Sequence, residues 1–335
     1  MKRKQILFTG VGVAELCDTE IGKPSENEVL VKTEVSVISA GTERDNLLAA
    51  PNTAGAGRFP IAEGYCSVGI VEETGANVKK VKAGDRVLCY HGNHADYNKV
   101  PASQVYPVRD RAIPPEHAAL VIIAAMGLGG VRKLRLEFGE SAMVMGLGLL
   151  GMFSVQFLRL SGAMPLMVAD LNEERRRIAL ATGAEYAFDP TDPDFSAKVK
   201  EITRGKGVKA IIEVTGKSIA LKQALDCAAY MGRISLLGCT RTSDCPIDYY
   251  QKVHRPGVEL IGAHNMVRPK LESYPYHWTN EDDCLAILDS ISTGRLNCKP
   301  LINEIHSPLE ASEVYAELAT NKSFPLGVLF DWRLL

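Results

Sequence analysis

The sequence predicts an α/β protein in which a β-rich first third is followed by a doubly wound parallel sheet. In the first third, short alternating or apolar runs are separated by turn clusters such as TGAN and KAGD, a pattern typical of antiparallel strands. From residue 114 onward, strand-like runs alternate with helix-like segments, which favours a parallel sheet with right-handed crossovers. A glycine loop lies directly between the first of these strands and the helix after it.

Size and composition narrow the class of protein. The chain has 335 residues, of which 46% are hydrophobic and 23% charged, so two soluble domains are expected. A net charge of −2 without a long basic run argues against a nucleic-acid partner. No run approaches the roughly 20 apolar residues of a membrane span, and the start MKRKQILFTG is too quickly polar for a signal peptide. The eight cysteines form no C-x-x-C pair, which predicts reduced thiols in a cytoplasmic protein.

The individual elements follow from these patterns. Strands are expected at 26–39, 67–75, 85–90 and 97–108, with a mobile Gly/Pro-rich loop at 50–60, and the first strand is expected to end on Ala-Gly-Thr-Glu at 40–43. A proline-led buried helix is expected at 114–134. Beyond it, strands are expected at 141–146, 165–170, 185–190, 209–216, 232–238 and 258–263, with helices at 151–162, 172–183, 194–205 and 218–232, and a further helix at 279–294.

The short tail is expected to pack back on the β-rich part, because it is too small for a separate domain. The expected division is therefore a discontinuous first domain, 1–116 with 265–335, and a nucleotide-binding domain, 117–264.

The glycine loop predicts a dinucleotide site. It reads G-L-G-L-L-G between strand and helix, so one glycine permits the turn, one admits the pyrophosphate and one allows close helix packing. Asp170 ends the next strand, where a carboxylate binds ribose hydroxyls and repels a 2′-phosphate, so NAD is expected and NADP is the alternative. Arg175, Arg176 and Arg177 keep that alternative open. The expected cofactor contacts are Gly146, Gly148, Leu149, Leu150, Gly151, Asp170, Leu171, Val214, Thr215, Gly216, Gly238 and Cys239.

Taken together, these stretches resemble the medium-chain dehydrogenase/reductase family. The resemblance is carried by SAGTE, KAGDRV, GLGLLG and DLNEERRRIALATGAEYAFDP, and it covers nearly the whole chain. It implies a GroES-like catalytic domain, a Rossmann domain and a homodimer or homotetramer. GYCSVG and CYHGNH are most similar to the subgroup of bacteriochlorophyllide and related sugar dehydrogenases.

The resemblance implies zinc, but the residues at the matching positions argue against it. Alcohol dehydrogenases of this family carry a cysteine and a histidine ligand where this chain has Ala40 and Ala62. The stretch after GDRV has no room for the family's four-cysteine structural zinc lobe. No metal site is therefore expected. A rearranged site using Cys66, His91, His94 or His264 is the alternative.

Without a metal, positioned hydroxyls and general bases must handle the proton. The expected catalytic residues are Thr42, Glu43, Glu63, Tyr65, His91, His94, His264 and Asn265. The segment HNMVRPKLESYPYHW mixes basic and aromatic groups, which suit either a polar substrate or a subunit contact.

These features predict an NAD-dependent oxidoreductase for a secondary alcohol of a polyol, sugar or related small molecule. Two alternatives stay open: a zinc-free quinone or enone reductase that uses NADPH, and a sensor that binds dinucleotide without turnover. No nucleic acid or membrane partner is expected.

Overall fold

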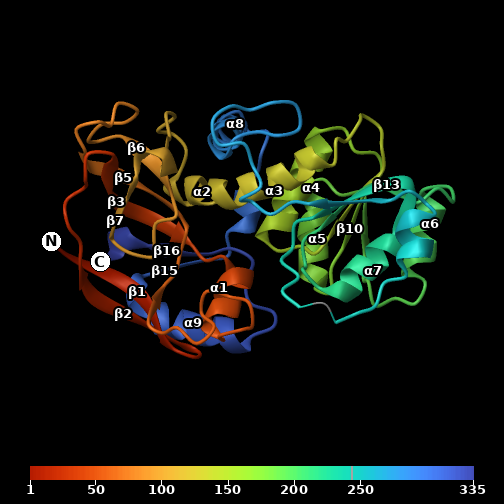
Figure 1. The fold of residues 1–335 in the computed structure, drawn as a ribbon, viewed down its shortest axis with the longest axis horizontal. Helices are drawn as coiled ribbons and strands as arrows, with labels where there is room; N and C mark the ends of the chain where they lie inside the picture. The colour runs from red at the N-terminus through yellow and green to blue at the C-terminus, as the bar shows by residue number, and fades with distance from the viewer. Residues whose placement is uncertain (243) are drawn as a thin grey trace. The chain divides into compact units, whose positions relative to one another are not determined.

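The computed structural model describes residues 1–242 and 244–335 and divides the chain into two compact units (Figure 1). The first unit comprises Met1–Ile123 and Cys284–Leu335, and the second comprises Ala124–Asp283. The chain crosses this division within helices α3 (Val121–Lys133) and α8 (Asn280–Ser292). The segment 265–283, expected with the first domain, groups with the second unit, whereas the tail groups with the first.

The first unit is built from two sheets of mainly antiparallel strands. In the described residues the smaller sheet has the order β2-β1-β4, and the larger has the order β15-β16-β3-β5-β6-β8 with β7 paired to β3. The strands are β1 Lys2–Gly10, β2 Val13–Glu20, β3 Glu28–Val37, β4 Ile61–Ala62, β5 Cys66–Thr74, β6 Arg86–Tyr90, β7 Tyr97–Pro101, β8 Val105–Pro107, β15 Glu304–His306 and β16 Val328–Asp331. Its remaining helices are α1 Ala40–Leu47, α2 Pro115–Ala119 and α9 Ala311–Thr320.

The expectation that the first strand ends on 40–43 is wrong. Strand β3 ends at Val37, and residues 40–47 form helix α1. The Glu43 carboxylate explains the switch, because its Oε1 accepts from the backbone N–H of Ser39 at 2.7 Å and so satisfies the N-cap residue. The expected single helix 114–134 is divided into α2 and α3.

The second unit is a parallel sheet with the strand order β11-β10-β9-β12-β13-β14 in the described residues. This order reverses between β9 and β12, as in doubly wound nucleotide-binding folds. The strands are β9 Ala142–Met145, β10 Leu166–Ala169, β11 Tyr186–Phe188, β12 Val208–Glu213, β13 Ala228–Leu236 and β14 Glu259–Gly262. The crossover helices are α4 Leu149–Leu160, α5 Glu173–Ala181, α6 Phe195–Ile202 and α7 Ser218–Cys227, followed by a π-helical turn at Tyr250–His254.

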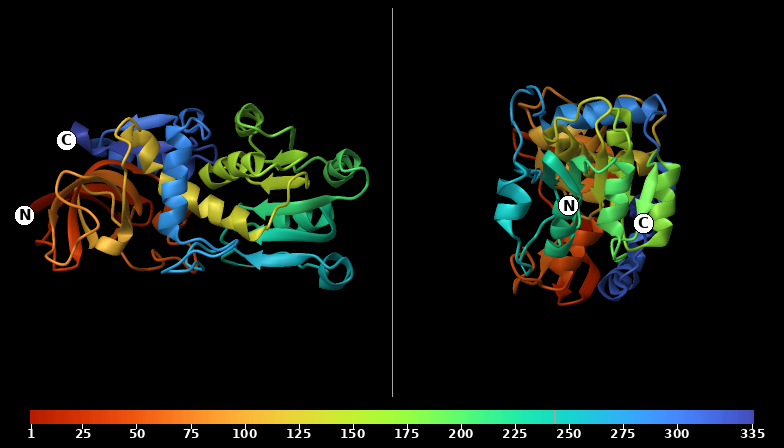
Figure 2. Two further views of the ribbon diagram at one scale, coloured as in Figure 1. Left: turned by 90° about the horizontal axis from the view of Figure 1, so that it is seen from above. Right: turned by 90° about the vertical axis from the view of Figure 1, so that its right-hand side faces the viewer.

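Helices cover both faces of this sheet (Figures 1 and 2). On one face Met143 and Ile211 pack with α6 and α7 side chains such as Val199 and Ala224 in one buried cluster. On the other face α3 and α4 approach strands β12 and β9. Both faces are thus removed from water, which explains the continuous apolar runs of these strands.

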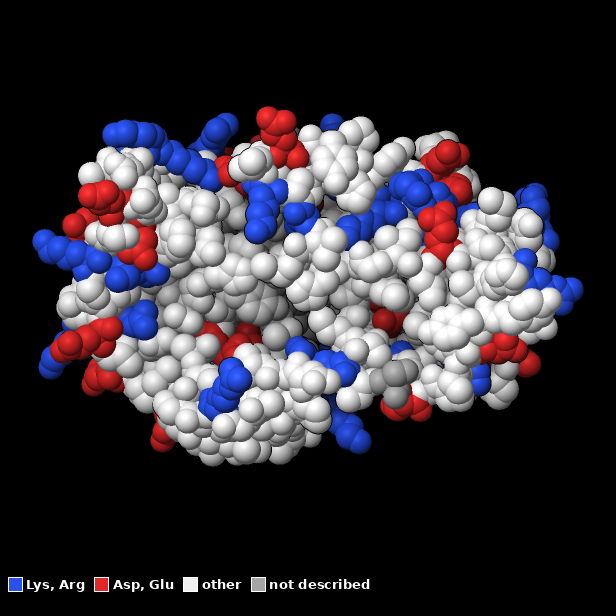
Figure 3. Space-filling model, in the orientation of Figure 1, with Lys and Arg blue, Asp and Glu red and all other residues white. Residues whose placement is uncertain are grey.

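Charges of both signs are interspersed over the face drawn in Figure 3, as the net charge of −2 leads one to expect. The eight cysteines are free thiols. Among the described residues, no helix is both long enough and apolar enough to cross a membrane.

We predict that Leu47→Ala destabilises the first unit while Leu48→Ala does not. Leu47 is 0% exposed in the core formed with α9, and its neighbour Leu48 is 40% exposed. Truncating a buried leucine leaves a cavity that costs about 2–5 kcal/mol, whereas an exposed truncation changes the free energy of unfolding by about 0.5 kcal/mol. Urea unfolding followed by the emission of Trp332, in a Trp278→Phe background, measures both. Equal losses in the two variants would contradict the helical register of α1.

Candidate functional site

The glycine loop lies between β9 and α4 and is shaped by backbone contacts. Gly146 has a φ of +97°, which favours glycine. A Cβ on Gly151 would lie 1.9 Å from the Gly146 carbonyl oxygen, so that position admits no side chain. A Cβ on Gly148 would meet nothing within 4 Å. The first and third glycines are therefore required by the fold, while the second faces open space where a ligand can approach.

Asp170 fastens this loop to the end of β10. Its Oδ2 accepts from the Leu147 backbone N–H at 2.6 Å, and its Oδ1 accepts from the Asn172 N–H at 2.8 Å. Each carboxylate oxygen has a second lone pair, so the group can still accept hydroxyl donors. Leu171 beside it is 69% exposed.

Arg176 and Arg177, two of the arginines that could have accepted the 2′-phosphate of NADP, form hydrogen bonds within α5 and the residues just before it. Arg176 donates to the Asp170 carbonyl oxygen at 2.6 Å, and Arg177 donates to Glu174 one turn away on the helix. A 2′-phosphate at this position would face the Asp170 carboxylate.

A buried glutamate that sequence reasoning missed shapes the neighbouring strand end. Glu213 is 1% exposed at the end of β12, and its carboxylate accepts from the N–H groups of Thr215 at 2.7 Å and Gly216 at 3.2 Å. Burial raises the pKa of Glu213. A Cβ on Gly238 would lie 2.2 Å from Gly216 N, so these two loops meet backbone to backbone. Val214 is half-buried, and Cys239 is exposed. In the sequence, Glu213 could have been recognised as an acidic residue at the end of an apolar strand.

In the first unit, a buried polar network centres on Glu43 of α1. Its side chain is 0% exposed. Besides the Ser39 N–H, its carboxylate accepts from the Tyr315 hydroxyl at 2.6 Å and lies 3.2 Å from His94 Nε2. A buried carboxylate is tolerated when donors surround it, and here they come from three separate parts of the chain.

His94 was expected in a polar loop, but it is 0% exposed within this network. Trp332 Nε1 donates to Ser36 Oγ at 2.9 Å, and Ser36 Oγ lies 2.7 Å from His94 Nδ1. Since Ser36 Oγ accepts from Trp332, its own hydroxyl proton is free to donate to His94 Nδ1. The ring proton of His94 is then on Nε2, which donates to the Glu43 carboxylate. His94 therefore orients Glu43 from the interior. His91 is exposed, has a φ of +57° and stacks on Tyr90.

Glu63 is a further buried carboxyl of this network. It is 9% exposed, and its Oε1 accepts from Asn46 Nδ2 at 2.9 Å. Burial and the nearby Glu43 carboxylate raise the pKa of Glu63 to about 7. A carboxyl with such a pKa can accept or release a proton near neutral pH.

Hydroxyl groups gather at the start of α1. Tyr65 donates to Ser39 Oγ and also hydrogen-bonds the Thr42 side chain, and both Tyr65 and Thr42 are half-buried. Burial raises the pKa of Tyr65, so this group acts as a neutral hydroxyl. Three hydroxyls in contact can pass or orient a proton without carrying charge.

The donor set does not fit the zinc that the family resemblance implies. Ala40 and Ala62 offer no ligand atom, and Glu43 is already surrounded by donors. Within residues 1–242 and 244–335, no group of three His, Cys, Asp or Glu side chains is arranged to hold a metal ion. Cys66 is buried, and burial raises its pKa well above the usual range, so a thiolate ligand is disfavoured there.

His264 and Asn265 belong to the second unit, after β14. His264 Nδ1 accepts from the Met266 N–H at 3.2 Å, and Asn265 Oδ1 accepts from Arg268 Nε at 2.9 Å. The structure thus gathers Thr42, Glu43, Glu63, Tyr65 and His94 in one unit and places these two residues in the other.

Sequence reasoning missed the partners that complete the network of the first unit. These are Ser36, Asn46, Tyr315 and Trp332. Tyr315 and Trp332 lie in the tail, and no local motif marked either of them. Asn46 could have been predicted, because in a helix over residues 40–47 it lies nearly one turn after Glu43 and so on the same face.

Two family profiles match the chain: the alcohol dehydrogenase GroES-like domain over residues 25–110 and the zinc-binding dehydrogenase over residues 150–271. L-threonine 3-dehydrogenase of Pyrococcus horikoshii is 30% identical, with 91% of each chain covered. D-guloside 3-dehydrogenase of Escherichia coli is 26% identical, covering 98% of this chain and 100% of the relative. A structure described as a zinc-binding dehydrogenase from Sinorhizobium meliloti, bound to NADP, superposes with a TM-score of 0.82 at 23% identity and covers 99% of both chains.

We predict that Glu63→Gln removes part of the pH dependence of stability. The folded-state pKa of about 7 lies above the ordinary 4.5, so the protonated carboxyl is favoured by folding. The protonated carboxyl therefore contributes about 3 kcal/mol to the free energy of unfolding. This contribution is fully present below pH 4.5 and is lost as the pH rises through 7. Gln mimics the protonated form, so the variant should match the wild type at low pH and exceed it at pH 8. Urea unfolding across this range measures the difference. Parallel curves would contradict the assignment, and Glu313→Gln, an exposed carboxyl, is the control.

We predict that alanine at Gly148 and at Gly151 has opposite effects. Gly151→Ala forces a Cβ to 1.9 Å from a carbonyl oxygen and should lower the melting temperature. Gly148→Ala meets open space, so it should melt like the wild type but bind dinucleotide at least tenfold more weakly, since the methyl group blocks backbone approach. Thermal melts and NADH titration separate the two. Wild-type NADH affinity in Gly148→Ala would contradict the placement of the pyrophosphate.

Proposed function

The chain belongs to the medium-chain dehydrogenase/reductase family, and we propose that it oxidises a secondary alcohol of a polyol, sugar or related small molecule with NAD and without catalytic zinc. As a member of this family it is an NAD(P)-dependent dehydrogenase of CH–OH donors. The choice of NAD, the absence of zinc and the class of alcohol are the proposed parts.

The observation that carries the proposal is the buried position of the Glu63 carboxyl, which contacts Asn46 and lies near the Glu43 carboxylate, so that its pKa is raised to about 7. Oxidation of an alcohol needs a group that accepts the hydroxyl proton while the hydride leaves the carbon. Zinc lowers the pKa of that hydroxyl in zinc-dependent relatives. Here Ala40 and Ala62 remove the expected ligands, and a buried carboxyl poised near neutrality supplies an alternative acceptor.

A dinucleotide held by the glycine loop and Asp170 would supply the hydride acceptor for the alcohol carbon. The hydroxyls of Thr42, Tyr65 and Ser39 orient the substrate oxygen, and Glu63 takes up its proton. The products are the carbonyl compound, the reduced nicotinamide and one proton, which returns to solvent. Glu43 and His94 have no exposed surface, so they act as positioning residues that hold α1 and its hydroxyls in place.

Asp170 supports NAD as the cofactor. Its carboxylate is held at the end of β10 by the Leu147 and Asn172 N–H groups, in a place where it can accept from ribose hydroxyls. The same charge would repel a 2′-phosphate. A structure of the same fold is bound to NADP, so both cofactors are compared in the experiment below.

We predict that protein freed of metal by chelation still oxidises a member of a polyol and sugar panel with NAD. Reduced cofactor is followed by absorbance, with NAD and NADP run in parallel and NAD preferred. Because Glu63 takes the proton, kcat should rise with pH through about 7 in the wild type. Glu63→Gln should lose about 10²–10⁴-fold in kcat and this pH dependence, with dinucleotide affinity unchanged.

Three outcomes would contradict the proposal in different ways. Activity that disappears on chelation and returns with zinc would overturn the zinc-free chemistry. NADPH-linked reduction of quinones or enones, without alcohol oxidation, would favour the reductase alternative. Tight dinucleotide binding without turnover across the panel would favour a sensor. Glu313→Gln is again the control and should retain the activity of the wild type.

A further inference from the structure

A depression in the second unit collects positively charged and aromatic side chains outside the glycine loop. It is shallow and open to solvent, with a cavity volume of only about 10 Å³, and lies between the end of α3 and the segment after β14. The lining side chains used below are Arg132, Lys133, His264, Arg268, His277 and Trp278. No Asp or Glu lines it among the described residues.

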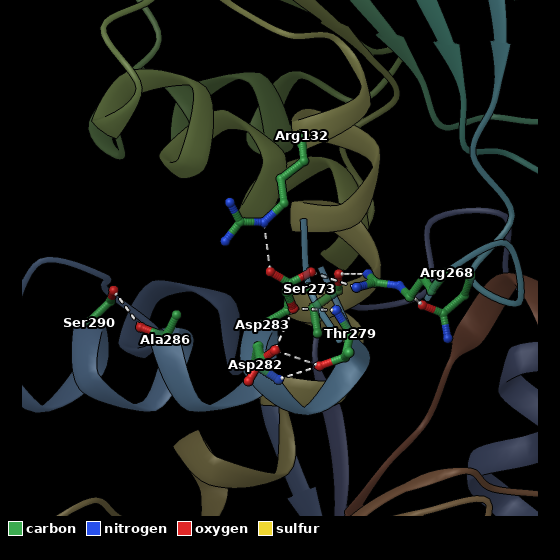
Figure 4. Close-up of polar contacts among 10 residues, drawn as sticks. Arg132, Arg268, Ser273, Thr279, Asp282, Asp283, Ala286 and Ser290 are labelled. Atoms are coloured by element: carbon green, nitrogen blue, oxygen red, sulfur yellow. Dashed lines mark hydrogen bonds and ion pairs between the residues drawn. The ribbon is translucent and has the colours of Figure 1, made fainter. Parts of the chain in front are cut away.

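One buried carboxylate contacts two of the guanidinium groups that line this depression (Figure 4). Asp283 is 0% exposed, and its oxygens accept from Arg132 Nε at 2.7 Å and from Arg268. One negative charge therefore faces two positive ones. The side chains that line the depression carry a surplus of positive charge, which is the condition under which a small anion is attracted.

The two arginines have different roles. Arg268 is used by the fold, because it donates to Asp283, to Asn265 Oδ1 and to the Ala125 carbonyl oxygen. Arg132 contacts Asp283 through Nε, and its plane lies over the Trp278 ring with 3.7 Å between guanidinium carbon and ring centroid. Figure 4 shows its two terminal nitrogens on the side away from Asp283. A guanidinium fixed in this way presents two donors in a planar pair, which suits a carboxylate or phosphate group.

Two further donors belong to the same lining. Lys133 Nζ donates one proton to the Gly262 carbonyl oxygen at 2.8 Å, and an ammonium group has three. Burial and the nearby Arg268 charge lower the pKa of Lys133, as expected where positive charges are not fully balanced. His264 accepts through Nδ1 from Met266 N, so the proton of its neutral ring is on Nε2, which is a donor.

We propose that this depression is a binding site for a small anion, a phosphate or carboxylate group held by Arg132, Lys133 and His264. A second depression of about 130 Å³ shares Lys133, Tyr276 and His277 with it, is lined also by Arg135 and Glu259, and offers room for the polar body of such a molecule. The site is separate from the loop at 146–151, and it does not depend on the proposed reaction.

Calorimetric titration of the full-length protein with inorganic phosphate tests the site. Saturating NADH is present so that the dinucleotide loop is filled, and ionic strength is held constant with sodium chloride. We expect saturable binding that weakens about tenfold in Lys133→Gln, because one charge-assisted hydrogen bond is lost. Lys270→Gln is the matched control, since it removes one exposed positive charge from the same segment without lining the depression. Its affinity should equal that of the wild type.

Trp278 gives an independent readout. It lines the depression, and the other tryptophan, Trp332, is buried in the first unit, so phosphate should change the emission of the wild type and not that of Trp278→Phe. Acetate and glucose 6-phosphate distinguish a carboxylate from a phosphate ligand, and glucose alone should not bind. Three results would overturn the site: no saturable phosphate binding, wild-type affinity in Lys133→Gln, or an equal loss in Lys270→Gln.

Discussion

The Glu43 carboxylate is fully buried and forms the centre of the first unit's polar interior. It contacts the Ser39 N–H, the Tyr315 hydroxyl and His94, which lie in α1's N-cap, in the tail helix α9 and in the loop after β6. A buried carboxylate without donors is very unfavourable, so its position fixes all three segments at once. Helix α1 therefore begins where it does, and its side chains Thr42 and Asn46 contact Tyr65 and Glu63 respectively.

Carboxylates at the ends of elements order the second unit in the same way. Asp170 holds the glycine loop, Glu213 holds the turn after β12, and Asp283 holds Arg132 and Arg268. Each acid ends a strand or begins a helix, where backbone N–H groups or guanidinium donors are available. The surrounding apolar strands supply the stability, and these acids determine the conformation of the segments that ligands would meet.

The chemistry proposed for the protein follows from what replaces a metal. Alanine at positions 40 and 62 takes away two donors, while Glu43, Glu63 and the hydroxyls of α1 remain. Burial near the Glu43 carboxylate raises the pKa of Glu63, which follows position 62 directly in the sequence. The raised pKa makes Glu63 a candidate general base. In the proposed reaction, the strength of this proton acceptor is thus set by its neighbours.

The sequence by itself determined the β-rich first part, the parallel sheet and the glycine loop with Asp170, because periodicity, glycine spacing and strand ends are local properties. It also led to the prediction that the tail packs with the first part. It did not determine that residues 40–47 are helical, that His94 is buried, or that Tyr315 and Trp332 complete the polar network. Those features depend on hydrogen bonds between residues up to 296 positions apart, which only the tertiary structure brings together.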